Sequence, residues 1–377
     1  MQRGAATSGK LVRPAEGHQR VRVMIVDDSL VARTVLSRIV AAEPDFEIVA
    51  KATTGEMALA RLSETAADVI LLDLEMPGMG GMGALPKILD VARDAKVLVV
   101  SSLTERGAES TLAALAIGAA DTLLKPRSGE FDETYARTLV GKIRALAPRG
   151  SARRPVTHAI PGARLTTATA ARSDFQALAI GASTGGIHAL CMLLGALPRS
   201  FTLPILVVQH LPPSFMATLA RQLATASGRT AALAEADKPL QPGHILVAPG
   251  DGHLIVRLRA GSLVTGVAHH AVPSGCTPSV DPLFETLADA TGGRTIGVVL
   301  SGMGRDGAIG AERLYKAGGT LFAQDAATSA VWGMPRAVAE AGLATAVLPP
   351  AAIAQRVAAL AAASPSNPEA IYRAASA

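Results

Sequence analysis

Short apolar runs alternate with amphipathic stretches along this chain, and the alternation limits the folds it can adopt. Runs that are apolar throughout read as strands buried on both faces, and parallel sheets between two layers of helices need such strands. The first five are VRVMIV (21–26), EIVA (47–50), DVILLD (68–73), KVLVVS (96–101) and TLLK (122–125), with helical patterns at 29–42, 55–64 and near 106–117. We therefore predict a doubly wound, five-stranded parallel α/β domain over residues 21–140.

The alternation resumes after residue 173. Its apolar runs are QALAIGAS, LPILVVQH, HILVAPG, HLIVRL, TIGVVLSG and GGTLFAQD. They predict a second α/β domain over 174–363, mostly parallel and Rossmann-like. Residues 141–173 are rich in Pro, Gly, Ser, Ala and Arg without apolar periodicity, and we interpret them as a linker. Residues 1–20 and 364–377 are expected to be tails, and 377 residues suffice for two cores.

Composition narrows the functional classes. No apolar run approaches the roughly 20 residues of a membrane span, and the N-terminus lacks the apolar core of a signal peptide. We expect a soluble, cytoplasmic, monomeric protein without membrane insertion. Cys191 and Cys276 are too few for a disulfide framework and lack CxxC spacing. The formal charge is +5, but dispersed basic residues and 3% aromatic residues disfavour nucleic-acid binding.

Polar side chains gather at the strand ends of the first domain. Asp27 and Asp28 follow the first strand, Asp73 ends the third, Ser101 the fourth and Lys125 the fifth. Carboxyl ends of parallel strands surround one crevice, where three carboxylates would repel one another unless a divalent cation lay among them. Carboxylate oxygens suit Mg²⁺. Asp73 would then attack a phosphoryl group whose oxygens Lys125 and Ser101 bind.

The alternative is that these carboxylates only cap helices or face water. Five coincident positions argue against it. DD at 27–28, DLEMPGMGG from 73, VVSS at 99–102 and GAADTLLKP from 118 resemble a response-regulator receiver domain, which has a flavodoxin-like fold. The resemblance implies phosphorylation of Asp73 by a histidine kinase, a metal site completed by the carbonyl of Glu75, and Ser101 as the switch hydroxyl. Thr122 departs from it, because receivers commonly place an aromatic residue there, so the usual aromatic rotation is expected to be absent.

The second domain carries GASTG, a GxSxG sequence directly after the strand QALAI. Such a turn exposes the Ser183 hydroxyl, and the following helix N-terminus favours a developing oxyanion. The alternative is a Gly-rich turn in which Ser183 caps the helix. A nucleophilic serine needs a base, and His210 ends the strand LPILVVQ on the same predicted sheet edge. Asp306, after TIGVVL, would orient the imidazole.

Two other interpretations concern the same residues. Residues 302–307 spell GxGxxG after a strand, and Asp325 ends the next strand as a ribose-binding acid would. Against a dinucleotide site, Asp306 lies where a pyrophosphate would approach, and Ser183 and His210 remain unexplained. His269, His270 and Cys276 share a loop and could form a metal cluster, but adjacent residues chelate awkwardly.

Several motifs together resemble the catalytic domain of the chemotaxis protein-glutamate methylesterases, the CheB family. They are GASTGG, VVQHLPPSF, HILVAPGD, SVDPLF, LSGMGRDG and AQDAATSAVWGMP. The resemblance implies hydrolysis of glutamate γ-methyl esters on chemoreceptor helices, glutamine deamidation, sensory adaptation, and no cofactor for the hydrolase. It also names the Met303 N–H as an oxyanion donor, and the place of Thr184 after the nucleophile suggests its N–H as a second.

Three functional classes compete. A phosphorylation-gated esterase is favoured over a DNA-binding response regulator, because the output domain is too large and strand-rich for a helix-turn-helix module. It is favoured over a non-enzymatic adaptor because all three triad residue types are present. We expect the unphosphorylated receiver to cover the Ser183 cleft and phospho-Asp73 to favour an open arrangement.

Overall fold

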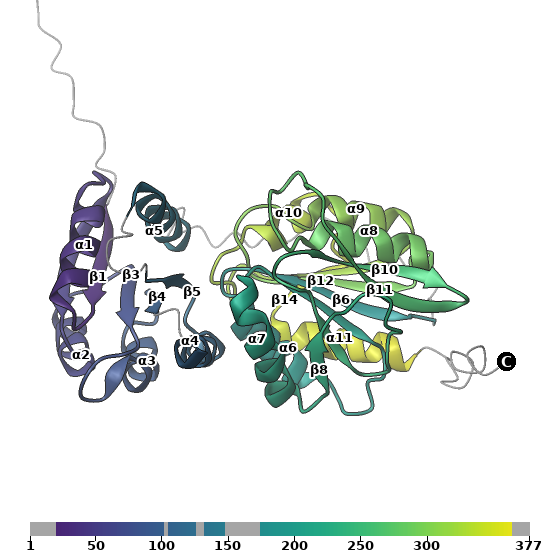
Figure 1. Ribbon diagram of the computed structural model, residues 1–377, viewed down its shortest axis with the longest axis horizontal. Helices are drawn as coiled ribbons and strands as arrows, with labels where there is room; N and C mark the ends of the chain where they lie inside the picture. The colour runs from purple at the N-terminus through teal and green to yellow at the C-terminus, as the bar shows by residue number, and fades with distance from the viewer. Residues whose placement is uncertain (1–19, 102–104, 126–131, 148–173, 364–377) are drawn as a thin grey trace, which may run out of the picture.

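The structure is a computed structural model that describes residues 20–101, 105–125, 132–147 and 174–363. Figure 1 shows two α/β bodies side by side, the first built by the N-terminal part of the chain. Residues 1–19, 148–173 and 364–377, which hold nearly all of the predicted tails and linker, lie outside the described residues.

The first body is a five-stranded, wholly parallel sheet in the order β2-β1-β3-β4-β5. Its strands are β1 (Val21–Val26), β2 (Phe46–Ala52), β3 (Val69–Asp73), β4 (Lys96–Ser101) and β5 (Asp121–Leu124), and its helices are α1 (Leu30–Ala41), α2 (Gly55–Glu64), α3 (Gly80–Val91), α4 (Glu105–Ile117) and α5 (Glu133–Leu146). The five predicted strands are confirmed.

Successive strand residues enter opposite cores, which is why these strands are apolar throughout. Ile70 and Leu72 of β3 pack in the cluster that includes α2, α3 and α4, while Val69 and Leu71 pack in the cluster that includes α1 and α5. Helix α5 runs to Leu146, so residues 141–146 are helical and not linker as we predicted.

The second body is a seven-stranded parallel sheet in the order β14-β13-β12-β6-β7-β9-β8. Its strands are β6 (Ala177–Ala182), β7 (Ile205–Gln209), β8 (Ala231–Leu233), β9 (Ile245–Val247), β12 (Thr295–Val299), β13 (Thr320–Gln324) and β14 (Ala346–Leu348), and its helices are α6 (Gly186–Ala196), α7 (Pro213–Ser227), α8 (Val280–Thr291), α9 (Ala308–Lys316), α10 (Met334–Glu340) and α11 (Pro350–Ala362). Helices α6, α7 and α11 cover one face, and α8, α9 and α10 the other (Figure 1).

One predicted run lies elsewhere. HLIVRL forms β10 (His253–Arg259), which pairs antiparallel with β11 (Ser262–Ala268) in a separate two-stranded sheet. Ala260 and Gly261 both have positive φ, 48° and 81°, as a two-residue hairpin turn requires.

The two bodies touch through α4. This helix packs against α6 and α7, and one apolar cluster continues from the receiver-like body into the second (Figure 1). Every helix within the described ranges is too short or too polar to cross a bilayer.

Candidate active site

The first body brings its predicted strand-end residues together. Carboxylate oxygens of Asp27, Asp28 and Asp73 lie within 4.8 Å of one another. The Lys125 ammonium lies 2.6 Å from Asp73 Oδ2 and 2.9 Å from Asp27 Oδ2. Three converging hard oxygen ligands are a donor set that fits Mg²⁺. None of these carboxylates caps a helix, since the cap of α1 is the Ser29 hydroxyl.

Burial and pairing together shift the pKa values of Asp73 and Lys125. Asp73 is 2% exposed, and burial raises its pKa despite the Lys125 ammonium and the Glu75 N–H bonded to its carboxylate. Burial works to lower the pKa of Lys125, but hydrogen bonding to Asp73 and the charge of Asp27 outweigh it and raise that pKa. The raised pKa of Lys125 favours its charged ammonium form, whereas burial of Asp73 opposes the ionised carboxylate that this ammonium pairs with.

Two buried hydroxyls lie near the same strand ends. Ser101 Oγ, at the end of β4, and Thr122 Oγ1, in β5, have no hydrogen-bond partner within the described part of the chain. An unpartnered buried hydroxyl costs free energy, so Ser101 is suited to gain a partner when a phosphoryl group arrives. Thr122, where the sequence departs from the receiver pattern, is buried.

The Ser183 turn joins β6 to α6 and explains its glycines. Gly185 has φ +76° and caps α6, and a Cβ there would collide with Ala330 and lie 2.7 Å from Ser301 Oγ. A Cβ on Gly302 would lie 2.8 Å from Ser183 Cβ. The turn is held by Ser183 N–H donating to Ser301 O at 3.0 Å and by Gln209 Nε2 donating to Ser183 O at 2.9 Å. Ser183 is thus not the helix cap, contrary to the alternative.

His210, which is partly buried, and Asp306, which is fully buried, form a pair beside this turn. Strand β6 lies between β12 and β7, and Ala182 pairs with Gln209, so Ser183 and His210 follow neighbouring strands at the same level. His210 Nε2 lies 2.8 Å from Asp306 Oδ2. Asp306 is 2% exposed and lies in the loop between β12 and α9.

The N-terminus of α8 holds the Asp306 carboxylate. Ser279 Oγ donates to Oδ1 at 2.6 Å, and Val280 N–H donates to Oδ2 at 2.8 Å. A helix N-terminus favours a negative charge. Sequence reasoning missed this support, although Ser279 before a helical run is a capping signal.

The contact between His210 and Asp306 shifts the pKa of both side chains. Burial works to lower the pKa of His210, but hydrogen bonds to Asp306 and Cys276 outweigh it and raise that pKa to about 9. Burial works to raise the pKa of Asp306, but bonding to His210, Ser279 and Val280 outweighs it and lowers the pKa. Asp306 is therefore ionised and stabilises an imidazolium at His210, the role of a triad carboxylate.

The third contact is open. Among the described residues, Ser183 Oγ makes no hydrogen bond to His210, a common state of triads without substrate. The backbone N–H groups of Thr184 and Met303 donate to no described residue. Both N–H groups are therefore available as hydrogen-bond donors.

The first body lies on this turn. Gly185 N–H donates to Ala120 O at 2.6 Å, and Thr184 Oγ1 donates to Asp121 Oδ2 at 2.7 Å. His188 Nδ1 lies 2.8 Å from Ala116 O. A cavity of only about 10 Å³ remains between Ser183 and these receiver residues. The α4–β5 corner leaves little room above the serine.

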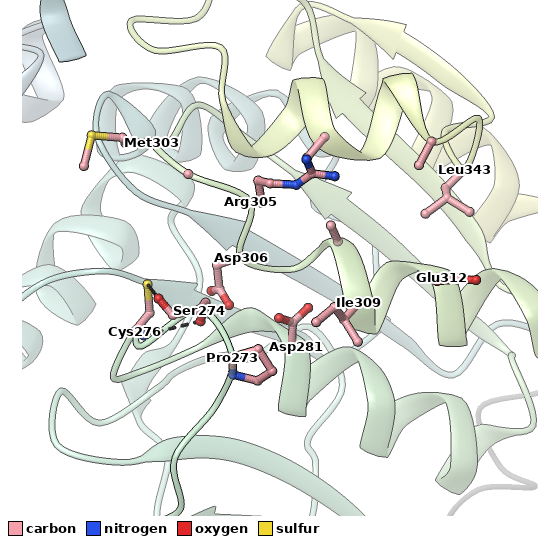
Figure 2. A pocket seen from close by; sticks show the side chains of 14 residues that line it. Pro273, Ser274, Cys276, Asp281, Met303, Arg305, Asp306, Ile309, Glu312 and Leu343 are labelled. Atoms are coloured by element: carbon pink, nitrogen blue, oxygen red, sulfur yellow. Dashed lines mark hydrogen bonds between the residues drawn. The ribbon is translucent and has the colours of Figure 1, made fainter. Parts of the chain in front are cut away.

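A second, larger cavity of about 540 Å³ has Asp306 in its lining. Figure 2 shows Cys276 and Asp306 at one end of it and Glu312 and Leu343 towards the other. Cys276 groups with His210 and Asp306, not with His269 and His270 as the metal-cluster alternative supposed.

The structure also argues against a dinucleotide site, because the proposed ribose-binding residue Asp325 already has hydrogen-bond partners. The Asp325 carboxylate accepts hydrogen bonds from the backbone and hydroxyl of Thr328.

Comparison with known proteins places this geometry in a family. Residues 178–357 match the CheB methylesterase family, and residues 23–133 match the response regulator receiver domain. A protein-glutamate methylesterase/protein-glutamine glutaminase of Caulobacter vibrioides is 46% identical over 335 residues, covering 87% of this chain and 95% of that protein. Similarly named proteins of Maricaulis maris and Azospirillum brasilense are 38% and 41% identical, each covering 89% of this chain and 94% and 91% of their own. The chain belongs to the CheB methylesterase family and carries a response regulator receiver domain on the N-terminal side of its hydrolase domain.

Proposed function

We propose that this chain is a protein-glutamate methylesterase, and also a protein-glutamine glutaminase, that acts on chemoreceptors and is activated by phosphorylation of Asp73. The observation that carries the proposal is the partly buried His210–Asp306 pair beside Ser183 in a chain of this family. The relatives' names give the substrates: a glutamyl methyl ester or a glutamine amide in a protein. Both reactions transfer an acyl group to water.

Acylation begins at Ser183. His210 accepts the hydroxyl proton as Ser183 Oγ attacks the ester carbonyl, and Asp306 stabilises the imidazolium. The Thr184 and Met303 N–H groups stabilise the oxyanion. His210 then returns the proton to the departing methoxy or amino group, so methanol or ammonia leaves.

Deacylation repeats the sequence with water. His210 accepts a proton from water as its oxygen attacks the acyl-serine carbonyl, and returns it to Ser183 Oγ. The glutamate carboxylate is released and the enzyme is regenerated. No part of this sequence requires a cofactor in the hydrolase domain.

Phosphorylation takes place at the other strand-end cluster. Asp73 Oδ attacks the phosphorus of a histidine kinase phosphodonor, Lys125 binds the transferred phosphoryl oxygens, and the Ser101 hydroxyl gains its partner there. Asp27, Asp28, Asp73 and the carbonyl of Glu75 would hold Mg²⁺, which when bound offsets negative charge on the carboxylates and the phosphoryl group. For phosphorylation to occur, Lys125 must give up at least part of its hydrogen bonding to Asp73.

Regulation follows from where the receiver lies. In the unphosphorylated arrangement Ala120 and Asp121 occupy the approach to Ser183, which excludes a receptor helix. Phosphorylation is proposed to favour an arrangement in which this corner has left the Ser183 turn. The chemistry of the triad is unchanged, and access controls the rate. Because the proposed substrates are cytoplasmic receptor segments, the activity is assigned to the cytoplasm, with the chain as a monomer.

The test uses methylated receptor membranes and measures methanol release. Ser183→Ala should abolish release while Asp73 still incorporates phosphate from a kinase, because the two sites use separate residues. Ser214→Ala is the matched control, since Ser214 is an exposed serine at the second position of the neighbouring helix α7. Retained release in Ser183→Ala would refute the triad. An unmodified chain that releases no methanol would instead be an adaptor.

A further inference from the structure

We propose that His210, Cys276 and Asp306 form a binding site for a thiophilic divalent cation such as Zn²⁺, and that the bound cation switches the hydrolase off. Nothing in the proposed catalytic cycle uses Cys276. Its thiol nevertheless lies with the general base and the orienting carboxylate in one cluster.

Three separate segments supply the ligands. His210 follows β7, Asp306 follows β12, and Cys276 lies between β11 and α8. Their ligand atoms all lie within 4.8 Å of one another. Zinc bonds to nitrogen, oxygen and sulfur of about 2.0–2.3 Å give tetrahedral ligand separations of about 3.3–3.8 Å. Against these separations, the 2.8 Å between His210 Nε2 and Asp306 Oδ2 would widen slightly, and no ligand pair would need to close by more than about 1.5 Å.

Donor chemistry selects the cation. One imidazole nitrogen, one thiolate and one carboxylate oxygen suit zinc, whereas an all-oxygen set suits magnesium. The chain thus holds two clusters of opposite preference, because Asp27, Asp28 and Asp73 offer only carboxylate oxygens. Magnesium sufficient for phosphorylation should leave the Cys276 cluster empty.

The surroundings support a metal-bound form. The Asp306 carboxylate keeps its hydrogen bonds from Ser279 and Val280, the outer contacts that commonly orient a ligating carboxylate. Cys276 and Asp306 line the cavity of about 540 Å³, which gives a cation an entry path and room for water as a fourth ligand (Figure 2).

Inactivation follows from the electron pairs. The cation takes the place of the proton between His210 Nε2 and Asp306 Oδ2, and the thiol proton of Cys276 leaves to solvent. In the neutral imidazole the displaced Nε2 proton moves to Nδ1, so the ring carries one proton there and its other nitrogen lone pair is bound to the cation. It has no lone pair left to accept the proton of Ser183. Binding is independent of the proposed function, whereas inactivation rests on it.

The experiment titrates the full chain with Co²⁺ at saturating Mg²⁺ and records the thiolate-to-cobalt charge-transfer absorption. We expect one such site per chain, displaced by Zn²⁺. Cys276→Ser should remove the absorption. Cys191→Ser should keep it, because burial raises the pKa of that thiol to about 11 and no metal-ligand group surrounds it among the described residues. Ser183→Ala should also keep it, although hydrolysis is lost.

Methanol release under buffered free Zn²⁺ tests the consequence. Zinc should inhibit the unmodified chain, and Cys276→Ser should raise the half-inhibitory concentration at least about 10- to 100-fold, the loss expected even for an outer-shell contact. Absence of the cobalt–thiolate band, or a band that survives Cys276→Ser, would overturn the site. A band without zinc inhibition would overturn the off-switch. A chain with the band but no methanol release at all would refute the proposed hydrolase and leave the site standing.

Discussion

Asp121→Ala should release the receiver from the Ser183 turn and raise the activity of the unphosphorylated chain. Asp121 lies at the start of β5, and its carboxylate accepts the Thr184 hydroxyl at 2.7 Å. Its side chain is 12% exposed, so solvent replaces this bond only partly. Hydrogen bonds to charged groups contribute about 1.5–3 kcal/mol, and partial exposure reduces this one to about 1–2 kcal/mol.

That loss fixes the expected rate. A change of 1–2 kcal/mol shifts a two-state population about 5- to 30-fold. If the open arrangement is the minor one, methanol release without phosphodonor should rise by that factor, up to the rate of the phosphorylated chain. The assay is run in an Asp73→Asn background, so that no phosphorylation contributes.

Two controls separate this bond from its neighbours. Lys142→Ala removes the 2.7 Å ion pair that Asp121 makes within the receiver but leaves the Thr184 contact intact. Glu109→Ala removes an ion pair with Arg221 across the same interface. The Arg221 side chain is 62% exposed and that of Glu109 is 64% exposed. Exposed pairs contribute about 0–1 kcal/mol, so this variant should change the rate little. Asp121→Ala that is no faster than its background would refute inhibition by covering.

Three further outcomes are expected. Asp306→Asn should lower kcat for methyl ester hydrolysis about 10³- to 10⁴-fold, because the imidazolium at His210 loses its counter-charge. Stopped-flow methanol assays measure this, and a variant in which only KM changes would contradict it. Gly185→Ala should destabilise the hydrolase domain by about 2–4 kcal/mol, because alanine is strained in the left-handed backbone conformation and its Cβ would overlap with Ala330. An unchanged midpoint of urea unfolding would contradict this. Thr122→Val should stabilise the receiver by about 1 kcal/mol in urea unfolding, because it removes an unpartnered buried hydroxyl, and a loss of stability would mean that the hydroxyl has a partner.

Periodicity predicted most of the strands because each central strand is buried on both faces. It could not predict β8 and β14, which are the three-residue edge strands of the sheet and have no fully buried residue, whereas the equally short β9 has two. The hairpin of β10 and β11 was missed for another reason. His253–Arg259 is apolar enough to resemble a central strand, and the turn at Ala260 carries a positive φ that sequence does not signal for alanine.

The proximity of the proposed triad residues could be predicted because strand ends converge in any parallel sheet. Their supporting contacts were not, because they come from segments whose approach depends on packing. Ser279 reaches Asp306 only through the placement of α8, and Cys276 reaches His210 through the loop before it. The linker boundary failed at residue 141 because Ile143 and Leu146 continue an apolar helix face into a segment that looked like linker by composition.

The bond between Thr184 and Asp121 also constrains the reverse direction of signalling. Thermodynamic linkage is reciprocal: if phosphorylation weakens this contact, anything else that breaks it must favour the phosphorylated receiver by the same factor. A receptor segment bound over Ser183 has to displace Asp121. An occupied hydrolase should therefore hold its phosphoryl group more tightly than an idle one. Substrate would then favour the phosphorylated state that admitted it, and enzyme without substrate would favour the closed state.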